Sequence, residues 1–219
     1  PLAKRLNDQR CIQNMNYETL AHTEIVQRVI NALAERGITA TVVNNRAEAL
    51  ERVTSLISKG ASVMNGSSRT LEEIGFIEYL KSGNHGWKNL HEEILAEKDQ
   101  AQQTILRKQA VLSDYYLGSV HAVAETGQLI IASNSGSQLP HVVFTSPNLI
   151  FVVGTQKITP NLDAAILRVR EYVLPLEDKR MKEVGMGGSA ISKLLIFERE
   201  QAFMGRKVQV IFVNEKLGF

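Results

Sequence analysis

Hydrophobic and polar positions follow two periods in the first third of the chain. Apolar residues between Tyr17 and Arg36 recur at helical spacing, and Gly37 follows where a helix end favours a left-handed residue. The next apolar run, 38–43, is short and β-branched, which is typical of a strand. A helical pattern over 46–58 and an apolar run at 61–65 repeat this order. The pattern therefore predicts helix, strand, helix and strand in succession.

The rest of the chain extends this alternation. Helical patterns cover 97–117 and the segment opened by Thr159 and Pro160, and strand-like apolar runs lie at 119–124, 128–132, 142–145, 149–153 and 208–213. Helices that alternate with short buried strands are typical of an α/β fold with parallel neighbours. No Pro/Ser-rich linker divides the chain. We therefore predict a single α/β domain over 17–219, with a mostly parallel sheet flanked by helices, and a polar N-terminal arm over 1–16.

The composition is that of a globular protein and excludes several functional classes. The 219 residues are 44% hydrophobic and 22% charged, with 25 Lys and Arg against 23 Asp and Glu. A formal net charge of +2 is too small for the basic field that nucleic-acid binding requires. The longest apolar runs are strand-sized, whereas a membrane span needs about 20 apolar residues. We therefore expect a cytoplasmic protein with no nucleic-acid or membrane partner.

The cysteine content limits which cofactors the chain can hold. Cys11 is the single cysteine, and it lies in the polar arm. An iron–sulfur cluster normally takes about four cysteinates, so this chain alone carries no iron–sulfur cluster. No pair among the five histidines has the i, i+4 spacing of a helical metal site. We expect neither a resident metal nor another cofactor.

A strand–turn–helix pattern provides the first candidate ligand site. It consists of Asn65, Gly66, Ser67, Ser68, Arg69 and Thr70. Glycine allows close backbone approach, and hydroxyls with free N–H groups at a helix start favour phosphate or carboxylate. Alternatively, these residues only cap the helix, with Thr70 as N-cap and Glu73 reaching back in a capping box. The pattern is neither a Walker A motif nor a dinucleotide-binding glycine motif.

The turn Glu125-Thr126-Gly127, between two apolar strands, is the second candidate. Burial of a carboxylate at such a turn would raise its pKa and suit it to general-base or nucleophilic work. Glu125 is therefore the candidate catalytic residue, with Thr126 and Gly127 as ligand-binding neighbours. The alternative is a plain hairpin turn in which the glutamate is solvated.

Two loops of small polar residues complete the candidate set. The first ends in His141, which titrates near neutral pH and either lines a pocket beside Glu125 or is structural. The second holds the candidate ligand-binding residues Gly187, Gly188, Ser189, Ser192 and Lys193. Its glycines, hydroxyls and lysine suit a phosphate or carboxylate, but the glycines alternatively only end one helix and turn the chain.

Taken together, these segments resemble the LUD (lactate-utilisation) domain family, which includes the LutC-like proteins. The likeness is carried by 65–75, 124–127, 139–143, the Gly-Ser loop and 207–213, and it spans about residues 20–215. The resemblance implies a fold similar to that of ribose-phosphate isomerases, glucosamine-phosphate deaminases, family I CoA transferases and formyltetrahydrofolate cyclo-ligases. In that superfamily a strand–Gly/Ser–helix turn holds phosphate, and CoA transferases use a glutamate at a comparable turn. The resemblance therefore implies an anion site at Gly66 and a reactive group at Glu125, although a shared fold does not determine the chemistry.

One segment departs from the family pattern. LutC-like relatives carry a Gly-Pro-Ser-x-Thr-Ala-Asp-Ile stretch, whereas this chain has Gly-Ser-Ala-Ile-Ser-Lys at 188–193. The chain therefore lacks the acid and gains Lys193, which removes any role inherited from that aspartate and favours an anion.

The resemblance implies a role in the utilisation of lactate or a related 2-hydroxy acid. The chain would bind a small carboxylate or phosphate-bearing ligand and act beside partner subunits that carry iron–sulfur clusters, and the superfamily suggests a homodimer. Two alternatives stay open. One is an independent enzyme that acts on a phosphorylated sugar or a CoA ester with Glu125 as base or nucleophile, and the other is a non-catalytic scaffold or sensor. The sequence does not decide whether the protein is an enzyme.

Overall fold

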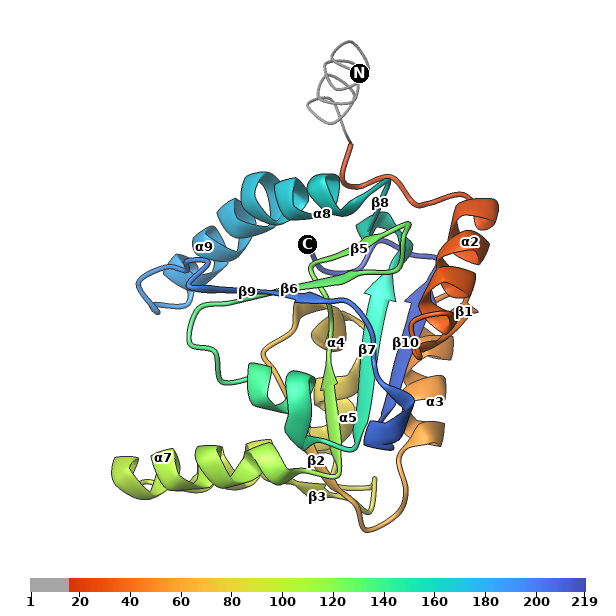
Figure 1. The fold of residues 1–219 in the computed structure, drawn as a ribbon. Coiled ribbons are helices and arrows are strands. Elements are labelled where there is room, and N and C mark those ends of the chain that lie inside the picture. Colours follow the sequence, from red (N-terminus) through yellow and green to blue (C-terminus); the bar gives the residue numbers. More distant parts are fainter. Residues whose placement is uncertain (1–15) are drawn as a thin grey trace.

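A computed structural model of the chain describes residues 16–219. All but the last residue of the arm predicted over 1–16, including Cys11, lies outside the described residues. The described part forms two β-sheets with helices on their outer sides (Figure 1).

The larger sheet has six strands in the order β1-β10-β7-β4-β2-β3. Their bounds are Thr39–Val43 for β1, Ser62–Asn65 for β2, Lys88–Asn89 for β3, Tyr115–Gly118 for β4, Asn148–Gly154 for β7 and Lys207–Val213 for β10. Every pairing within this sheet is parallel. The structure therefore confirms the mostly parallel sheet, and the carboxyl ends of all its strands reach the same edge.

The central strand β7 shows why this sheet is covered on both faces. Leu149, Phe151 and Val153 belong to one hydrophobic core, whereas Ile150 and Val152 belong to the core on the opposite face. Side chains alternate in this way because a strand has a period of two residues. All five are buried, which is typical of a parallel strand between two layers.

The core on the Ile150 side is closed by three helices, α3 (Arg46–Leu56), α4 (Arg69–Glu73) and α5 (Phe76–Lys81). Val53, Leu71 and Phe76 from these helices are fully buried in it. The chain then continues through α6 (Leu90–Ala96) and α7 (Gln100–Gln109) toward β4.

A smaller sheet of four strands lies on the other side, in the order β8-β5-β6-β9. The bounds are Ala122–Ala124 for β5, Leu129–Ser133 for β6, Ile158–Thr159 for β8 and Lys193–Phe197 for β9. Val123 and Leu129 pack into the core that also holds α2 (Thr23–Ala34) and β7. Ala122 and Ile130, on the opposite face of this sheet, pack against α8 (Leu162–Arg168). The layers thus run helix, sheet, sheet, helix.

Helix α8 continues without interruption through the π-helix η4 (Val169–Val173) into α9 (Leu174–Glu183). Pro175 has no N–H group and would clash with the carbonyl four residues earlier in a regular helix. The wider π turn, whose hydrogen bonds span five residues, lies directly before this proline. The continuous helical segment from α8 to α9 lies along the smaller sheet, as Figure 1 shows.

Three predicted elements differ in the structure. The helix predicted over 97–117 ends earlier, and Tyr115–Gly118 is instead the buried strand β4. The strand predicted over 142–145 is the π-helix η2 (His141–Thr145), because Pro140 before it already has helical dihedral angles. Helix α8 is capped by Asn161, whose side chain accepts from the N–H of Ala164, rather than by Thr159.

Within residues 16–219, no helix has the length and apolar character that would let it cross a membrane.

Candidate anion-binding cavity

A cavity of about 350 Å³ opens at the carboxyl ends of the parallel strands. Gly66 directly follows β2, Gly118 ends β4, and Lys157 lies just after β7. The facing wall comes from the loop after β6, from the η4–α9 helix and from the segment before β9. Ligands of open α/β sheets bind at this strand edge. The topology thus brings together segments that are far apart in the sequence.

The strand-to-helix turn predicted as a ligand site lines this cavity from Gly66 to Thr70. A Cβ atom on Gly66 would lie 2.5 Å from the Tyr116 hydroxyl oxygen, so the close approach requires glycine. Ser68 is the N-cap of α4, because its Oγ accepts from the N–H of Leu71. The predicted cap is therefore displaced from Thr70 to Ser68, which leaves the Thr70 hydroxyl for another contact.

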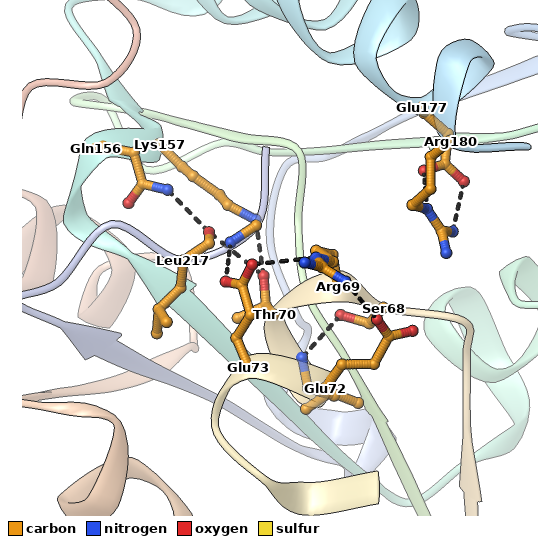
Figure 2. Close-up of polar contacts among 12 residues, drawn as sticks. Ser68, Arg69, Thr70, Glu72, Glu73, Gln156, Lys157, Glu177, Arg180 and Leu217 are labelled. Carbon is orange, nitrogen blue, oxygen red and sulfur yellow. Dashed lines mark hydrogen bonds and ion pairs between the residues drawn. The ribbon is translucent and has the colours of Figure 1, made fainter. Parts of the chain in front are cut away.

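Glu73 does not close the predicted capping box. Its Oε1 pairs with Arg69 at 3.2 Å, and its Oε2 accepts from the N–H of Gly218 at 2.7 Å. The glutamate thus fastens the segment after β10 to α4, at the side of the cavity where Figure 2 shows Lys157 and Thr70.

Lys157 lines this cavity, and Figure 2 shows its side chain reaching Thr70. It is 3% exposed, and its Nζ donates to Thr70 Oγ1 and to Ser119 Oγ, each at 3.1 Å. Among the described residues, no carboxylate lies within the 4.0 Å that defines an ion pair with Nζ. Burial, followed by the charge of Arg168, lowers the pKa of Lys157 to about 7, while Glu73 acts in the opposite direction.

The two hydroxyls that hold Lys157 are themselves oriented by the backbone. Thr70 Oγ1 donates to the carbonyl of Leu217 at 3.5 Å, and Ser119 Oγ donates to the carbonyl of Val120 at 3.3 Å. Since a hydroxyl has a single proton, both oxygens act as acceptors toward Nζ. The N–H groups of Lys157 therefore meet two fixed acceptors.

A second cation approaches from α9. Arg180 forms a bidentate pair with Glu177, with both N–O distances at 2.8 Å. Its Nη2 also donates to Ser67 Oγ at 3.3 Å, which joins α9 to the turn after β2 across the cavity. Because Ser67 Oγ accepts in this contact, its proton stays available to a ligand.

His121 lines the same cavity and is neutral. Its Nδ1 accepts from the N–H of Ala132 at 3.1 Å, so Nε2 carries the proton of the neutral ring. Burial lowers the pKa of His121 to about 3, with smaller contributions from the charges of Lys157 and Arg168. The imidazole is therefore a neutral donor in the cavity wall.

The Glu125-Thr126-Gly127 turn lies outside the cavity lining, against α2. Glu125 Oε2 pairs with Arg28 Nη2 at 3.0 Å. The Thr126 carbonyl accepts from Arg36 at 2.7 Å, and a Cβ atom on Gly127 would contact the same arginine. The structure thus brings Glu125 together with α2 and not with the 66–70 turn, and its catalytic role stays a prediction.

His141 also lies outside the cavity lining. Its Nδ1 is 2.9 Å from Ser146 Oγ and 3.3 Å from Ser113 Oγ, and its ring stacks on Tyr116 with the centroids 4.5 Å apart. Burial lowers the pKa of His141 to about 4. These contacts match the structural alternative, and they do not place His141 beside Glu125.

The glycine-rich segment is divided between cavity and surface. Gly188 and Ser189 line the cavity, whereas Gly187, Ser192 and Lys193 do not. Ser189 is held by α9, because its N–H donates to Asp178 Oδ1 at 2.9 Å. Ser192 and Lys193 both bond to Asn134 in the loop after β6, so they support the cavity wall from outside.

Asn65 belongs to a separate groove of about 310 Å³ on the other side of the same turn. Its Nδ2 donates to the Gly66 carbonyl at 3.2 Å, and its own carbonyl lies 3.2 Å from His91 Nδ1. The Gly66–Ser68 turn lines both hollows and so forms the partition between them.

Sequence reasoning missed Lys157, Ser119 and Arg180. The one available signal was the place of Lys157, four residues after the end of the apolar run 149–153, where α/β proteins collect functional groups. Ser119 and Arg180 carried no comparable signal, since their part in the cavity depends on tertiary packing.

Comparisons with known proteins identify a matching family and a protein of similar fold. The family model of the LUD domain matches residues 26–213. The structure is similar to a crystal structure of a DUF162 family protein from Deinococcus radiodurans, with a TM-score of 0.55, 15% identity, and coverage of 90% of this chain and 100% of the other. At this level of identity the likeness shows the fold alone. No curated protein gives a significant match.

Proposed function

The chain belongs to the LUD domain family, which supports a role associated with lactate utilisation, and on that premise we propose that its cavity binds the carboxylate of a small 2-hydroxy or 2-oxo acid. The observation that carries the proposal is Lys157. Burial without a counter-charge lowers the pKa of Lys157 to about 7, and its Nζ is bonded only to neutral hydroxyls, so an anionic ligand would stabilise the charged form.

The cavity wall also suits a small organic acid. Its polar side presents Lys157 and the hydroxyls of the 66–70 turn, whereas Val169, Val173 and Ile191 give an apolar surface. Pockets that combine a few fixed polar groups with apolar walls are typical of small-molecule sites, and a volume of about 350 Å³ is at the lower end of their range.

Calorimetric titration with L-lactate and pyruvate tests this proposal. We expect Lys157→Met to weaken binding about 10- to 100-fold, because a charge-assisted hydrogen bond contributes about 1.5–3 kcal/mol. Lys108→Met, on the exposed side of α7, removes the same charge without touching the cavity and serves as the matched control.

Inorganic phosphate, a sugar phosphate and a CoA ester complete the panel. Binding of one of these, with no heat from either small acid, would replace the carboxylate proposal with the independent-enzyme alternative. Equal affinities of the wild type and Lys157→Met for lactate and pyruvate would remove the lysine from the site.

We further propose that electrons released in lactate oxidation pass to separate iron–sulfur subunits. What supports this part is the single cysteine of the sequence, against the four cysteinates that a cluster normally takes. Co-expression with a cluster-bearing subunit, followed by anaerobic affinity purification, should yield a brown complex in fixed stoichiometry. A colourless protein that elutes alone would contradict it.

A further inference from the structure

We propose that Lys157 is a nucleophile that forms an imine with the keto carbon of a small 2-oxo acid. This inference deepens the proposed function and rests on it, because the acid must first occupy the cavity. It assigns the ligand a carbonyl group in addition to its carboxylate.

The hydrogen bonds around Nζ leave one direction unused. A neutral amine has two N–H bonds and one lone pair. The two N–H bonds are accounted for by Thr70 Oγ1 and Ser119 Oγ, both of which act as acceptors because their own protons are given to backbone carbonyls. None of the described residues donates a hydrogen bond to Nζ. The lone pair is therefore left to the contents of the cavity that Lys157 lines.

The protonation state agrees with this arrangement. With a pKa of about 7, a large fraction of Lys157 is the free amine at neutral pH. For an ordinary lysine the free-amine fraction at pH 7 is below about 1 in 10³. A lysine that is desolvated in a pocket is the usual form of this nucleophile in imine chemistry.

Neighbouring groups can hold the rest of the ligand. Nε2 of His121 carries a proton in the cavity wall and is neutral, so it can donate to the keto oxygen without repelling Lys157. Ser67 Oγ has its proton free for the carboxylate while Nζ is bonded to the keto carbon, and Arg180, which is paired with Glu177, holds that hydroxyl in place.

The step balances without a further reactant. The Nζ lone pair forms a bond to the keto carbon, and the keto oxygen takes one proton from the amine to give a carbinolamine. The hydroxyl then leaves with the second amine proton as water, and the carbon–nitrogen bond becomes double. Nothing is oxidised or reduced, so the imine forms from the amine and the acid alone.

Reductive trapping tests the inference. The protein is incubated with pyruvate and sodium cyanoborohydride, digested, and mapped by mass spectrometry. We expect the peptide containing Lys157 to gain the mass of the acid less one oxygen atom, at one adduct per chain. L-lactate has no keto group, so it cannot form the imine and should slow the labelling by competition. Lys157→Arg keeps the cation and should abolish the adduct, whereas Lys108→Arg should leave it unchanged.

The outcomes separate the imine from the binding site. If calorimetry shows pyruvate binding and no adduct forms at Lys157, the imine is refuted while the proposed function stands. Labelling of Lys157 no faster than of the exposed Lys108 would also overturn the imine. Absence of any pyruvate or lactate binding would remove the proposed function itself. The adduct is mapped on the wild-type protein, so the test does not depend on whether a variant folds.

Discussion

The Nζ atom of Lys157 lies 3.1 Å from Oγ1 of Thr70, although 87 positions separate the two residues in the sequence. The contact joins the turn after β7 to α4, which follows β2. These two strands flank β4 in the sheet and run parallel to it, so their carboxyl ends lie at one edge. The buried cation is thus a product of the sheet topology.

Gly218→Ala should impair ligand binding through this contact. Gly218 has a φ of +62°, and a Cβ atom there would lie 2.5 Å from Thr70 Oγ1 and 3.1 Å from Lys157 Nζ. Overpacking of this kind costs about 1–3 kcal/mol and is relieved when Thr70 and Lys157 move from their places, so we expect pyruvate binding, measured by calorimetry, to weaken by about tenfold.

Gly185→Ala is the matched control for that variant. Gly185 has a φ of +76° but nothing within 4 Å of its added Cβ atom, so it shares the backbone strain without the collision. Equal losses of pyruvate affinity in Gly218→Ala and Gly185→Ala would argue against the contact.

Gly66→Ala should destabilise the fold in a way that Tyr116→Phe corrects. The added Cβ atom would lie 2.5 Å from the Tyr116 hydroxyl but 3.6 Å from the ring carbon that bears it. We expect Gly66→Ala alone to lower the free energy of unfolding by about 1–3 kcal/mol. Urea denaturation of the two single variants and the double variant gives the coupling energy, and simple additivity would show that the hydroxyl is not the obstacle.

Glu125→Gln should leave carboxylate binding unchanged, because Glu125 lies against Arg28 and not in the cavity. Exposed pairs of this kind contribute about 0–1 kcal/mol, so the loss of stability should also be small and should match that of Arg28→Gln. Calorimetry and thermal unfolding measure both quantities. A large fall in ligand affinity or turnover for Glu125→Gln alone would restore the catalytic role predicted from the sequence.

Acid should destabilise the protein through His121 and His141. Their pKa values are lowered to about 3 and about 4 in the folded chain, from 6.5 in the unfolded one. Below pH 6.5 the unfolded state therefore binds protons that the folded state does not. The stability these groups contribute is complete above pH 6.5 and is lost as the pH falls toward 4 and then 3.

Urea denaturation at several pH values between 4.5 and 7.5 would show this dependence. His141→Gln should give a shallower fall in the free energy of unfolding with acid than the wild type. His22→Gln, at an exposed position, serves as the surface control for the substitution. Parallel slopes for wild type and His141→Gln would contradict the assignment.

The strands were predictable where burial alone shapes the sequence. The run at 149–153 is apolar throughout, and that at 208–213 is apolar except for Gln209, because both sides of β7 and β10 face a core. The strand Tyr115–Gly118 was predicted as part of a helix because helical spacing of apolar residues continues up to it. No glycine or proline marks the end of the helix at Ser113 and Asp114. The strand β9 was not predicted, since its residues are mostly half-buried and follow a glycine-rich segment.

The site was predictable only where it is local. The 66–70 turn was located because small residues between a strand and a helix are adjacent in the sequence. The contacts of Lys157 with Thr70 and Ser119 span 87 and 38 positions, and no local pattern states which loops share an edge of the sheet. The hairpin turn at Glu125 was recognised, but the direction it faces depends on how the smaller sheet lies on the larger one.

The π turn at Val169–Val173 determines the direction in which each side chain of α9 points around the helix axis. Each residue of a regular helix advances the chain by about 100°. Deleting a single residue from this turn would restore α-helical winding and rotate α9 by about that angle, with little change in its length. Arg180 would then face away from Ser67, and Pro175 would enter a regular helix that cannot accommodate it. The extra residue of this π turn thus fixes which side of α9 closes the cavity.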